Sequence, residues 1–476
     1  MSPDTISLLQ RTFPRLRALP RLRHAPGTRL APAPPFTAPL LGHVPAMRGG
    51  RLDYMMRLAL DHGDVVRLEL PMITAHLVSH PDLVQRILVD EHRTFTKETR
   101  GYDNLRIFLG NGLVTSEGEL WLRQRRIAQP AFHRKRIAGF VPVMVRAIDD
   151  LLEAWEGLAA SGATVDVAAE MTRLTLRIAG QTLLSTDPSA HAGSIAAALV
   201  AVQHESNLRI NSIWSPPLGW PLPRNRRYQA AAGELDRVVM DIIERRRRGT
   251  ESKDDLLQML LEARDPETGA AMDDRQLRDE VMTMFLAGHE TTSNALAWTF
   301  YLLSRFPSVA RALAEEASAV LGDRAPVADD LPRLDLCRRV LQESMRLYPP
   351  VWMMGRAPSR DVELGGYHVP AGSLVFLSQW VLHRHPRWWA DPEGFDPDRW
   401  LPERAAGMHR HQYFPFASGP RMCIGAGFAT MEGQLVLASV ARRFRLDLVP
   451  GRRVEPEPLI TLRPREGVPV TIHRRR

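Results

Sequence analysis

The chain has 476 residues, of which 44% are hydrophobic, so it can bury a large core. Its two cysteines, Cys337 and Cys423, exclude a disulfide framework and a zinc cluster, and they fit a reducing cytoplasm. The net charge of +8 arises from 62 Lys and Arg against 54 Asp and Glu, but no nucleic-acid-binding motif accompanies this excess. We therefore expect no nucleic-acid partner.

Residues 1–34 form the first predicted segment, a tail rich in arginine and proline. Apolar residues recur in it at near-helical spacing, but Pro14 and Pro20 interrupt them. The tail lacks a secretory apolar core, and no run in the chain reaches the ~20 apolar residues needed to span a bilayer. We expect a flexible tail with at most weak membrane-surface contact, followed by one domain over residues 35–476.

Short alternating runs at residues 64–70 and 75–78 predict a small β-rich region near the N-terminus. A further strand is expected at residues 373–377. Most of the remaining chain, including residues 119–126, shows helical periodicity. The run from Arg245 to Arg248 is interpreted as the solvated last turn of a helix. The pattern as a whole predicts a mainly α fold of the α+β class.

The longest predicted helix begins at an N-cap formed by Asp273 or Asp274 and continues to Phe306. Its length is about 33 residues, which corresponds to ~50 Å at the helical rise per residue. Because its middle is strongly apolar, this helix is expected to run through the centre of the protein.

Residues 287–292 weaken this long helix near its centre. Gly288 costs roughly 1 kcal/mol in a helix, and threonine hydroxyls compete for backbone carbonyls. The physical interpretation is a groove in which Ala287 and Gly288 leave room for a ligand, with Thr291 one turn beyond Ala287 on the same face. A kink that contains a satisfied threonine is the alternative. His289 points away from Thr291, and we expect it to be structural.

Cys423 lies in a tight, basic loop at the start of a helix that is expected to reach about Phe444. Phe416 and Arg421 precede the cysteine and Gly425 follows it. Helix-end N–H groups and the nearby guanidinium favour the thiolate, which is the form that binds a metal. The glycines let the backbone approach a flat ligand. The alternative is a buried structural cysteine that follows a turn.

Two residue pairs add to this pattern. Glu343 and Arg346 stand three positions apart on a predicted helix, a spacing at which they can pair, and Arg399 lies in a later proline-bounded segment. Trp121 and Arg125 share one helical face, where an indole N–H and a guanidinium suit a carboxylate. For Trp121 and Arg125, an amphipathic arginine helix with a packed tryptophan is the alternative.

These motifs, in this order, resemble those of the cytochrome P450 family over nearly the whole chain beyond the tail. The loop from Phe416 to Gly425 matches F-x-x-G-x-R-x-C-x-G, and residues 287–292 fill every position of A/G-G-x-D/E-T-T. Elements similar to E-x-x-R and W-x-x-x-R are also present. In the P-E-R-F element, Asp398 and Trp400 replace the usual Glu and Phe.

The resemblance implies one large helical domain around a buried haem b, with Cys423 as the iron ligand. It also implies that Thr291 hydrogen-bonds dioxygen at the iron and that Glu290 relays protons. The residues that it places at the haem are Trp121, Arg125, Arg356, Phe416, Arg421, Gly425 and Ala287. The buried charge network that it predicts, which would hold the cysteine loop, consists of Glu343, Arg346 and Arg399.

The implied activity is a haem-dependent monooxygenation that hydroxylates or epoxidises an apolar small molecule, such as a fatty acid, terpenoid, steroid or polyketide-like compound. The residues expected to line the substrate pocket offer almost no polar groups: Phe285, Leu286, Val351, Trp352 and Met353. The sequence after Cys423 is too short for a flavin or iron–sulfur domain. Electrons from NAD(P)H are therefore expected to arrive through a ferredoxin or flavodoxin with its reductase, and we expect a cytoplasmic monomer.

Two other functions of a haem-thiolate protein stay open. An enzyme that rearranges or dehydrates a peroxide needs no reductase and no acid–threonine pair, so Glu290 and Thr291 argue against it. A non-catalytic haem-binding sensor or carrier would need neither a proton relay nor a substrate pocket.

Overall fold

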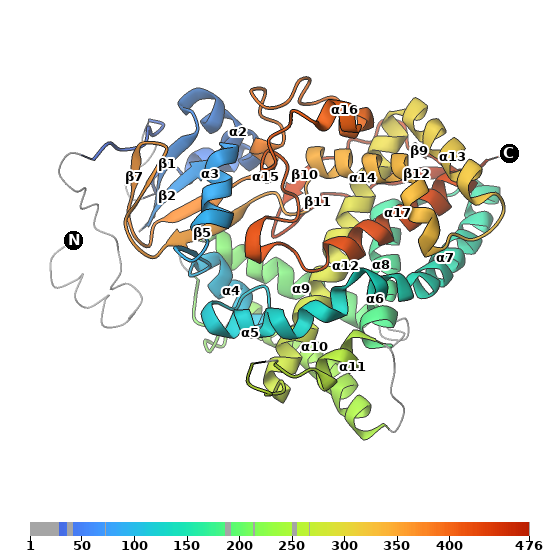
Figure 1. The fold of residues 1–476 in the computed structure, drawn as a ribbon, viewed down its shortest axis with the longest axis horizontal. Helices are drawn as coiled ribbons and strands as arrows, with labels where there is room; N and C mark the ends of the chain where they lie inside the picture. Colours follow the sequence, from blue (N-terminus) through green and yellow to red (C-terminus); the bar gives the residue numbers. More distant parts are fainter. Residues whose placement is uncertain are drawn as a thin grey trace. The chain divides into compact units, whose positions relative to one another are not determined.

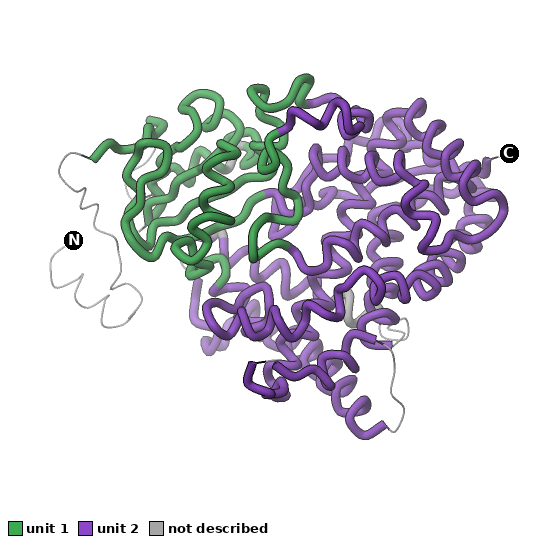
Figure 2. Tube along the Cα trace, in the orientation of Figure 1, with its two compact units in different colours: residues 1–102, 353–392, 409–422 green, residues 103–352, 393–408, 423–476 purple. Residues whose placement is uncertain are grey.

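The computed structural model describes residues 28–35, 41–71, 73–185, 192–212, 215–249, 255–265 and 267–475. Figure 1 labels the helices and most of the strands. Contacts divide the chain into two compact units (Figure 2). Unit 1 comprises Met1–Tyr102, Met353–Pro392 and His409–Met422, and unit 2 comprises Asp103–Trp352, Glu393–Met408 and Cys423–Arg476. The single domain expected over residues 35–476 stays a prediction.

Unit 1 is built on a five-stranded sheet with the order β1-β2-β8-β5-β3. Strands β1 and β2 form an antiparallel hairpin, β8 joins β2 in parallel, and β5 returns antiparallel. The three strands predicted from alternation are thus confirmed. The elements of unit 1 are α2 (Arg51–His62), β1 (Val65–Leu70), β2 (Ile73–Val78), α3 (Pro81–Gln85), β3 (Phe95–Thr96), β5 (Met354–Pro358), β6 (Val362–Leu364), β7 (Tyr367–Val369), β8 (Leu374–Leu377) and α15 (Gln379–Leu382).

The proline-rich segment before α2 packs onto this sheet. The Pro32 carbonyl accepts a 2.8 Å hydrogen bond from the Arg67 N–H of β1, and the Arg29 carbonyl accepts one of 2.9 Å from His368. Ala31 belongs to the buried core of unit 1. Residues 29–32 thus pack on unit 1, because β1 and β7 each donate a backbone hydrogen bond to them, and the boundary at residue 34 stays a prediction. Residues 1–27 of the predicted tail lie outside the described residues.

Unit 2 is helical. Helix α4 (Arg100–Leu109) leads into it, and its small strands are β4 (Thr164–Asp166), β9 (Phe444–Leu448), β10 (Pro456–Pro458), β11 (Leu462–Pro464) and β12 (Pro469–Arg474). Its helices are α5 (Gly118–Ala128), α6 (Arg134–Gly139), α7 (Val141–Ser161), α8 (Val167–Leu184), α9 (Ala192–Asn211), α10 (Pro223–Arg248), α11 (Leu256–Glu262), α12 (Asp274–Arg305), α13 (Pro307–Leu321), α14 (Asp335–Leu347), α16 (Pro402–Ala405) and α17 (Ala426–Arg443).

Helix α12 is the predicted long helix, and its 32 residues confirm the prediction. The Asp273 side chain accepts a 2.7 Å hydrogen bond from the Gln276 N–H and so caps the first turn. The helix packs against α8, α10, α14 and α17 (Figure 1). This surrounding shell explains why nearly all of its middle is buried, as its apolar pattern indicated.

The arginine run ends α10 as predicted, but it is not uniformly solvated. Arg246 donates two 2.6 Å hydrogen bonds to the carboxylate of Asp255, and both side chains are buried. The same guanidinium also reaches the Leu184 carbonyl at 3.0 Å. The prediction of a solvated turn is wrong for Arg246, because this paired arginine ties α10 to the chain after it and to the end of α8.

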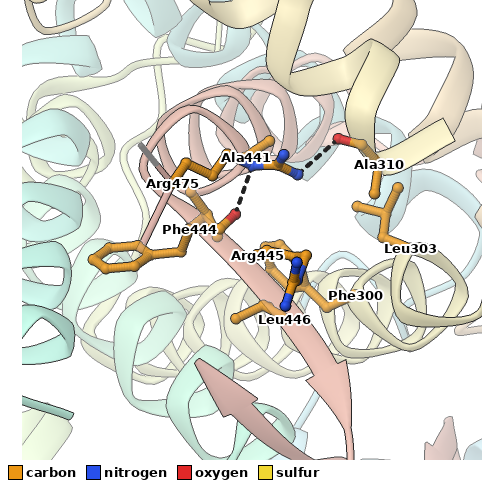
Figure 3. Close-up of a pocket in the computed structure, with 9 residues that line it drawn as sticks. Phe300, Leu303, Ala310, Ala441, Phe444, Arg445, Leu446 and Arg475 are labelled. Carbon is orange, nitrogen blue, oxygen red and sulfur yellow. Dashed lines mark hydrogen bonds between the residues drawn. The ribbon is translucent and has the colours of Figure 1, made fainter. Parts of the chain in front are cut away.

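The C-terminal strand β12 ends at a small pocket in unit 2 (Figure 3). Arg475 donates to the carbonyls of Phe444 and Ala310, at 3.2 and 3.1 Å. The pocket lies beside Phe300 and Leu303 of α12, and its volume is about 20 Å³. That volume holds roughly one water molecule, so no larger molecule fits in this pocket. Among the described residues, no helix is long and apolar enough to cross a membrane.

Candidate functional site

The backbone of the cysteine loop requires a glycine at position 419. A short 3₁₀ turn, Gly419–Arg421, precedes Cys423, and α17 begins three residues after the cysteine. Gly419 has φ of +68°, and a Cβ there would come within 2.1 Å of the Leu88 carbonyl oxygen. This position therefore requires glycine. The helix after the loop ends at Arg443, one residue earlier than predicted, because Phe444 starts β9.

Side chains in unit 1 hold the residues that lead into this loop. Ser418 and His411 are both buried, with the serine hydroxyl 2.9 Å from the histidine Nε2. The Phe414 N–H donates to the His383 Nε2 at 3.0 Å. Phe416 and Arg421, which were predicted to contact the haem, are half-buried.

Part of the Cys423 residue is open to solvent, although many protein atoms lie near its sulfur. Burial raises the pKa of the Cys423 thiol above its ordinary value, while the Gly425 backbone N–H and the charge of Arg125 act to lower it. In the protein without a bound metal this burial opposes the thiolate, and the predicted preference for the thiolate stays a prediction. A bound metal cation reverses this balance, because it stabilises the thiolate directly.

The structure brings the predicted anchor helix α5 to this cysteine. Trp121 and Arg125 are half-buried on α5. Burial lowers the pKa of Arg125, and the charge of Cys423 raises it, so the two groups lie within electrostatic range of each other. Ile424, the residue after the cysteine, packs against the buried apolar cluster that includes Phe285 of α12. Cys423 and Ile424 therefore lie near α5 and α12 within unit 2.

The centre of α12 exposes one small residue among buried ones. Leu286 and His289 are 6% and 4% exposed, whereas Ala287 between them is exposed. The Thr291 hydroxyl donates to the Ala287 carbonyl at 2.7 Å, and that of Thr292 donates to the Gly288 carbonyl at 3.0 Å. The helix stays continuous here, although these hydroxyls bond to carbonyls of their own helix, an interaction that slightly weakens a helix.

His289 has the structural position that was expected of it. It is buried, and its Nδ1 lies 3.1 Å from the Phe285 carbonyl. Burial lowers the pKa of His289 to about 4, so the ring is neutral at neutral pH. Its own carbonyl accepts a 3.0 Å hydrogen bond from Thr175 of α8.

Glu290 has partners that the sequence did not reveal. Its Oε1 accepts a 2.7 Å hydrogen bond from the Thr461 hydroxyl, and its Oε2 accepts one of 2.5 Å from the Gln203 amide. Burial raises the pKa of Glu290, while the Thr461 hydrogen bond and the charge of Arg463 lower it. The two donors lie 171 and 87 residues away along the chain, and neither belongs to a recognisable motif.

The predicted charge network is present and buried in unit 2. The Glu343 carboxylate accepts 2.9 and 2.8 Å hydrogen bonds from Arg346, and one of 3.3 Å from Arg399. Trp400 also donates to it at 3.0 Å, a bond that the usual phenylalanine could not make. Asp398, the other departure from the family's pattern, instead pairs with Arg339. The network ties α14 to the segment that contains Arg399 and Trp400.

The predicted pocket residues fall into two groups. Phe285 and Leu286 are each 6% exposed and belong to the apolar cluster of unit 2. Trp352 is buried as well, and its indole N–H donates to the Leu459 carbonyl at 2.9 Å. Val351 and Met353 are half-buried.

The residues present fit a haem. In unit 2, Cys423 and Ala287 offer open surface on elements that are otherwise packed, and Arg125 adds a cation beside the thiol. In unit 1, the Arg356 guanidinium is 3% exposed and donates to uncharged groups, the Tyr102 hydroxyl at 3.3 Å and the Gly355 carbonyl at 2.8 Å. A buried guanidinium bonded to neutral acceptors is a suitable partner for a carboxylate.

Comparison with known proteins agrees with this chemistry. The family model for cytochrome P450 matches residues 32–468. Cyclooctatin synthase of Streptomyces melanosporofaciens is 39% identical, with 89% of this chain and 92% of the relative covered. Cyclooctat-9-en-7-ol 5-monooxygenase of the same organism is also 39% identical, with 88% and 90% covered.

Two more comparisons extend to another organism and to a solved structure. Pentalenene oxygenase of Streptomyces avermitilis is 34% identical, with 90% of this chain and 94% of the relative covered. The crystal structure of the cytochrome P450DA heme domain has a TM-score of 0.87 and 31% identity, with 94% and 98% of the two chains covered. The chain with this cysteine loop and threonine-bearing helix therefore belongs to the cytochrome P450 family, and it is a haem-thiolate monooxygenase that uses dioxygen to oxidise an apolar small molecule.

Proposed function

We propose that this protein hydroxylates a cyclic terpenoid, either a hydrocarbon or one of its mono-alcohols. The observation that carries this proposal is the similarity to enzymes named for cyclooctat-9-en-7-ol and pentalenene, over about nine-tenths of the chain. A ring compound of this kind has few polar atoms, and its recognition depends on apolar surface.

The polar groups beside the apolar residues are already occupied. Trp352 uses its indole N–H for the Leu459 carbonyl, and His289 is neutral and bonded to the Phe285 carbonyl. A neutral imidazole has one N–H, which His289 uses for the Phe285 carbonyl, so neither of these two side chains has an N–H left to donate to a carboxylate-bearing substrate. This favours a terpenoid over a fatty acid.

We assign Cys423 to the iron, with Trp121, Arg125, Arg356 and Arg421 at the haem. When bound, the haem supplies a thiolate-ligated iron at which dioxygen is activated by two externally supplied electrons. The protein's own part is to exclude water, orient the substrate and deliver protons.

Thr291 and Glu290 are assigned to proton delivery. A threonine hydroxyl has one hydrogen, and that of Thr291 is directed to the Ala287 carbonyl. A rotation about χ1 redirects this hydrogen, and the small exposed side chain of Ala287 leaves space for the movement. Glu290, one residue before, has a raised pKa and can hold a proton at higher pH than an ordinary carboxyl.

Electrons are proposed to come from NAD(P)H through a ferredoxin or flavodoxin and its reductase, to a monomer in the cytoplasm. Arg134 and Lys135 of α6 are exposed and come one short 3₁₀ turn after the anchor helix α5, so they offer a basic surface to an acidic carrier. Arg123 and Arg126 of α5 bond to Gln276 and Glu267 and so contribute less. Electron transfer should slow as ionic strength rises, since the Debye length is ~8 Å at physiological salt.

A binding assay tests the substrate class. Cyclooctat-9-en-7-ol and pentalenene should shift the haem from low to high spin, whereas a straight-chain fatty acid of similar carbon number should not. Turnover with labelled dioxygen should place one labelled oxygen atom in the terpenoid. Preferential oxidation of the fatty acid would reject the substrate class, and rearrangement or dehydration of an organic hydroperoxide without any reductant would favour the rearrangement enzyme.

Ligand replacement tests the thiolate. The Cys423→His variant should retain some haem but lose the red-shifted carbon monoxide complex of the reduced protein. The Cys337→Ala variant is the matched control, because Cys337 is buried in α14 and should leave the spectrum unchanged. Loss of the red-shifted complex in Cys337→Ala instead would show that Cys423 is not the ligand.

A further inference from the structure

The carboxyl of Glu290 is held by two separate parts of unit 2. The Thr461 hydroxyl, in the turn between β10 and β11, donates to Oε1 at 2.7 Å. The Gln203 amide, on α9, donates to Oε2 at 2.5 Å. Each oxygen of this carboxyl therefore has its own donor, and neither donor lies on α12 itself.

The direction of these hydrogen bonds is fixed by the donors. Thr461 has one hydroxyl hydrogen, which goes to Glu290, and its oxygen accepts a 3.1 Å hydrogen bond from the Asn294 amide. Two donors on one carboxyl favour its ionised form, whereas burial favours the protonated form. When Glu290 takes up a proton, one of its oxygens becomes a donor. The hydrogen bond that this oxygen accepts is then weakened, because a neutral carboxyl is a poorer acceptor than a carboxylate.

Thr461 and Gln203 differ in how firmly their own segments are fixed in the structure. The turn that carries Thr461 is fixed by three further hydrogen bonds, from Trp298 to the Leu462 carbonyl at 3.0 Å, from Trp352 to the Leu459 carbonyl at 2.9 Å, and from the Leu462 N–H to the Pro350 carbonyl at 2.8 Å. Thr461 is therefore a fixed support for Glu290.

Gln203 is attached differently, because α9 is bonded to α10. Arg209 of α9 pairs with Glu205 at 2.9 Å and donates to Asn225 of α10 at 2.7 Å, and all three side chains are buried. These contacts join α9 to α10 as one hairpin. A shift of that hairpin would break the Gln203–Glu290 hydrogen bond and leave the Thr461 bond in place.

We propose that Gln203 and Thr461 are positioning residues for Glu290, with Thr461 as the fixed support and Gln203 as the partner whose release lets the carboxyl turn toward Thr291. The inference rests on the proposed role of Glu290 in proton delivery. In this proposal, a shift of the α9–α10 hairpin breaks the Gln203–Glu290 hydrogen bond, and Glu290 can then deliver its proton toward Thr291.

Infrared spectroscopy of the full-length, haem-loaded protein tests the positioning directly. The carboxyl band that disappears in Glu290→Gln identifies Glu290, and a pH titration of that band follows its protonation. In Thr461→Val and in Gln203→Leu, the loss of a donor should shift the titration to higher pH. Thr461→Ser keeps the hydroxyl and should restore the wild-type curve.

Two control variants remove a threonine hydroxyl and a glutamine amide that do not contact Glu290. Thr172→Val removes a hydroxyl that donates to its own helix at the Ala168 carbonyl, and Gln258→Leu removes an exposed amide that bonds to Glu262. Both should leave the Glu290 band unchanged. Unchanged bands in Thr461→Val and Gln203→Leu as well would overturn the proposal, and Gln203→Leu alone decides the matter if the valine variant does not fold.

Turnover with NADPH, a surrogate ferredoxin and its reductase, and pentalenene as the test substrate provides the second readout. Product formed per NADPH should fall about tenfold in Thr461→Val, since a hydrogen bond to a charged group is lost, and Thr461→Ser should recover it. Suppose that the carboxyl band shifts in Thr461→Val, but product formed per NADPH is unchanged both in that variant and in Glu290→Gln. This result would support the positioning of Glu290 and reject proton delivery by Glu290. In this way the failure of the inference and the failure of the proposed function give different results.

Discussion

The backbone N–H of Leu113 donates a 3.0 Å hydrogen bond to the carboxyl of Glu280, which is fully buried on α12. The neighbouring Asn111 N–H donates to Asp279 at 2.8 Å, so the segment between α4 and α5 is fastened to the first half of the central helix. Burial raises the pKa of Glu280 to about 8, the charge of Asp279 raises it too, and the Leu113 N–H lowers it.

Stability should therefore decrease as the pH rises from about 5 to 8. In this range folded Glu280 keeps a proton that the unfolded chain has released, because the ordinary glutamate pKa is 4.5. The slope from this one group is roughly 1.4 kcal/mol per pH unit. Glu280→Gln keeps an acceptor for Leu113 and removes the titration, so its advantage over the wild type should grow with pH in thermal unfolding. Exposed Glu363→Gln is the control, and parallel curves for Glu280→Gln and wild type would contradict the assignment.

Removing the shared carboxylate of the buried network should be severe. Glu343→Gln leaves the guanidiniums of Arg346 and Arg399 buried without a counter-charge, which should cost roughly 3–5 kcal/mol of unfolding free energy. Trp400→Phe, which restores the family's usual residue, removes one donor and should cost only about 1 kcal/mol. Denaturant unfolding of both variants, with exposed Glu403→Gln as control, measures the difference. Equal losses in the two variants would show that the ionic contacts contribute little.

Thr291 and Thr292 provide a matched pair for testing oxygen chemistry. Both donate to their own helix, but Thr292 is 4% exposed and Thr291 is half-buried. Thr291→Ala should keep haem content and substrate binding, lower product per NADPH at least ~10-fold and raise hydrogen peroxide, because proton delivery becomes unproductive. Thr292→Ala should lose some stability and keep its coupling. If Thr291→Ala remains fully coupled, this segment shapes a pocket and does not handle protons.

Arg125 should matter for haem retention more than its neighbour on the same helix. Arg125 lies within electrostatic range of Cys423, whereas Arg123 donates to Gln276 at 2.9 Å. Titration of haem-free protein with haemin should give at least a ~10-fold weaker dissociation constant for Arg125→Gln, through loss of a charged hydrogen bond. Arg123→Gln should bind haemin as the wild type does. Equal affinity in all three proteins would remove Arg125 from the haem site.

Local chemistry in the sequence was sufficient to predict several parts of the structure. The cysteine loop needs glycine at position 419 because the chain passes within van der Waals distance of Leu88, and such a requirement appears as a motif. The length of α12 follows from its apolar run and from the cap at Asp273. The strands of unit 1 follow from alternation. Each of these signals lies within one short stretch of chain.

Tertiary structure alone decided what these parts contact. Glu290 is held by Gln203 and Thr461, from segments 87 and 171 residues away, and single hydrogen-bonding side chains at such separations leave no periodic pattern. The same holds for Glu280, because a glutamate in a helix is ordinarily solvated and only packing could bury it and raise its pKa to about 8. The same applies to Cys423: its motif supplies the Gly425 N–H locally, but the approach of the Arg125 charge on α5 is set by how the helices pack.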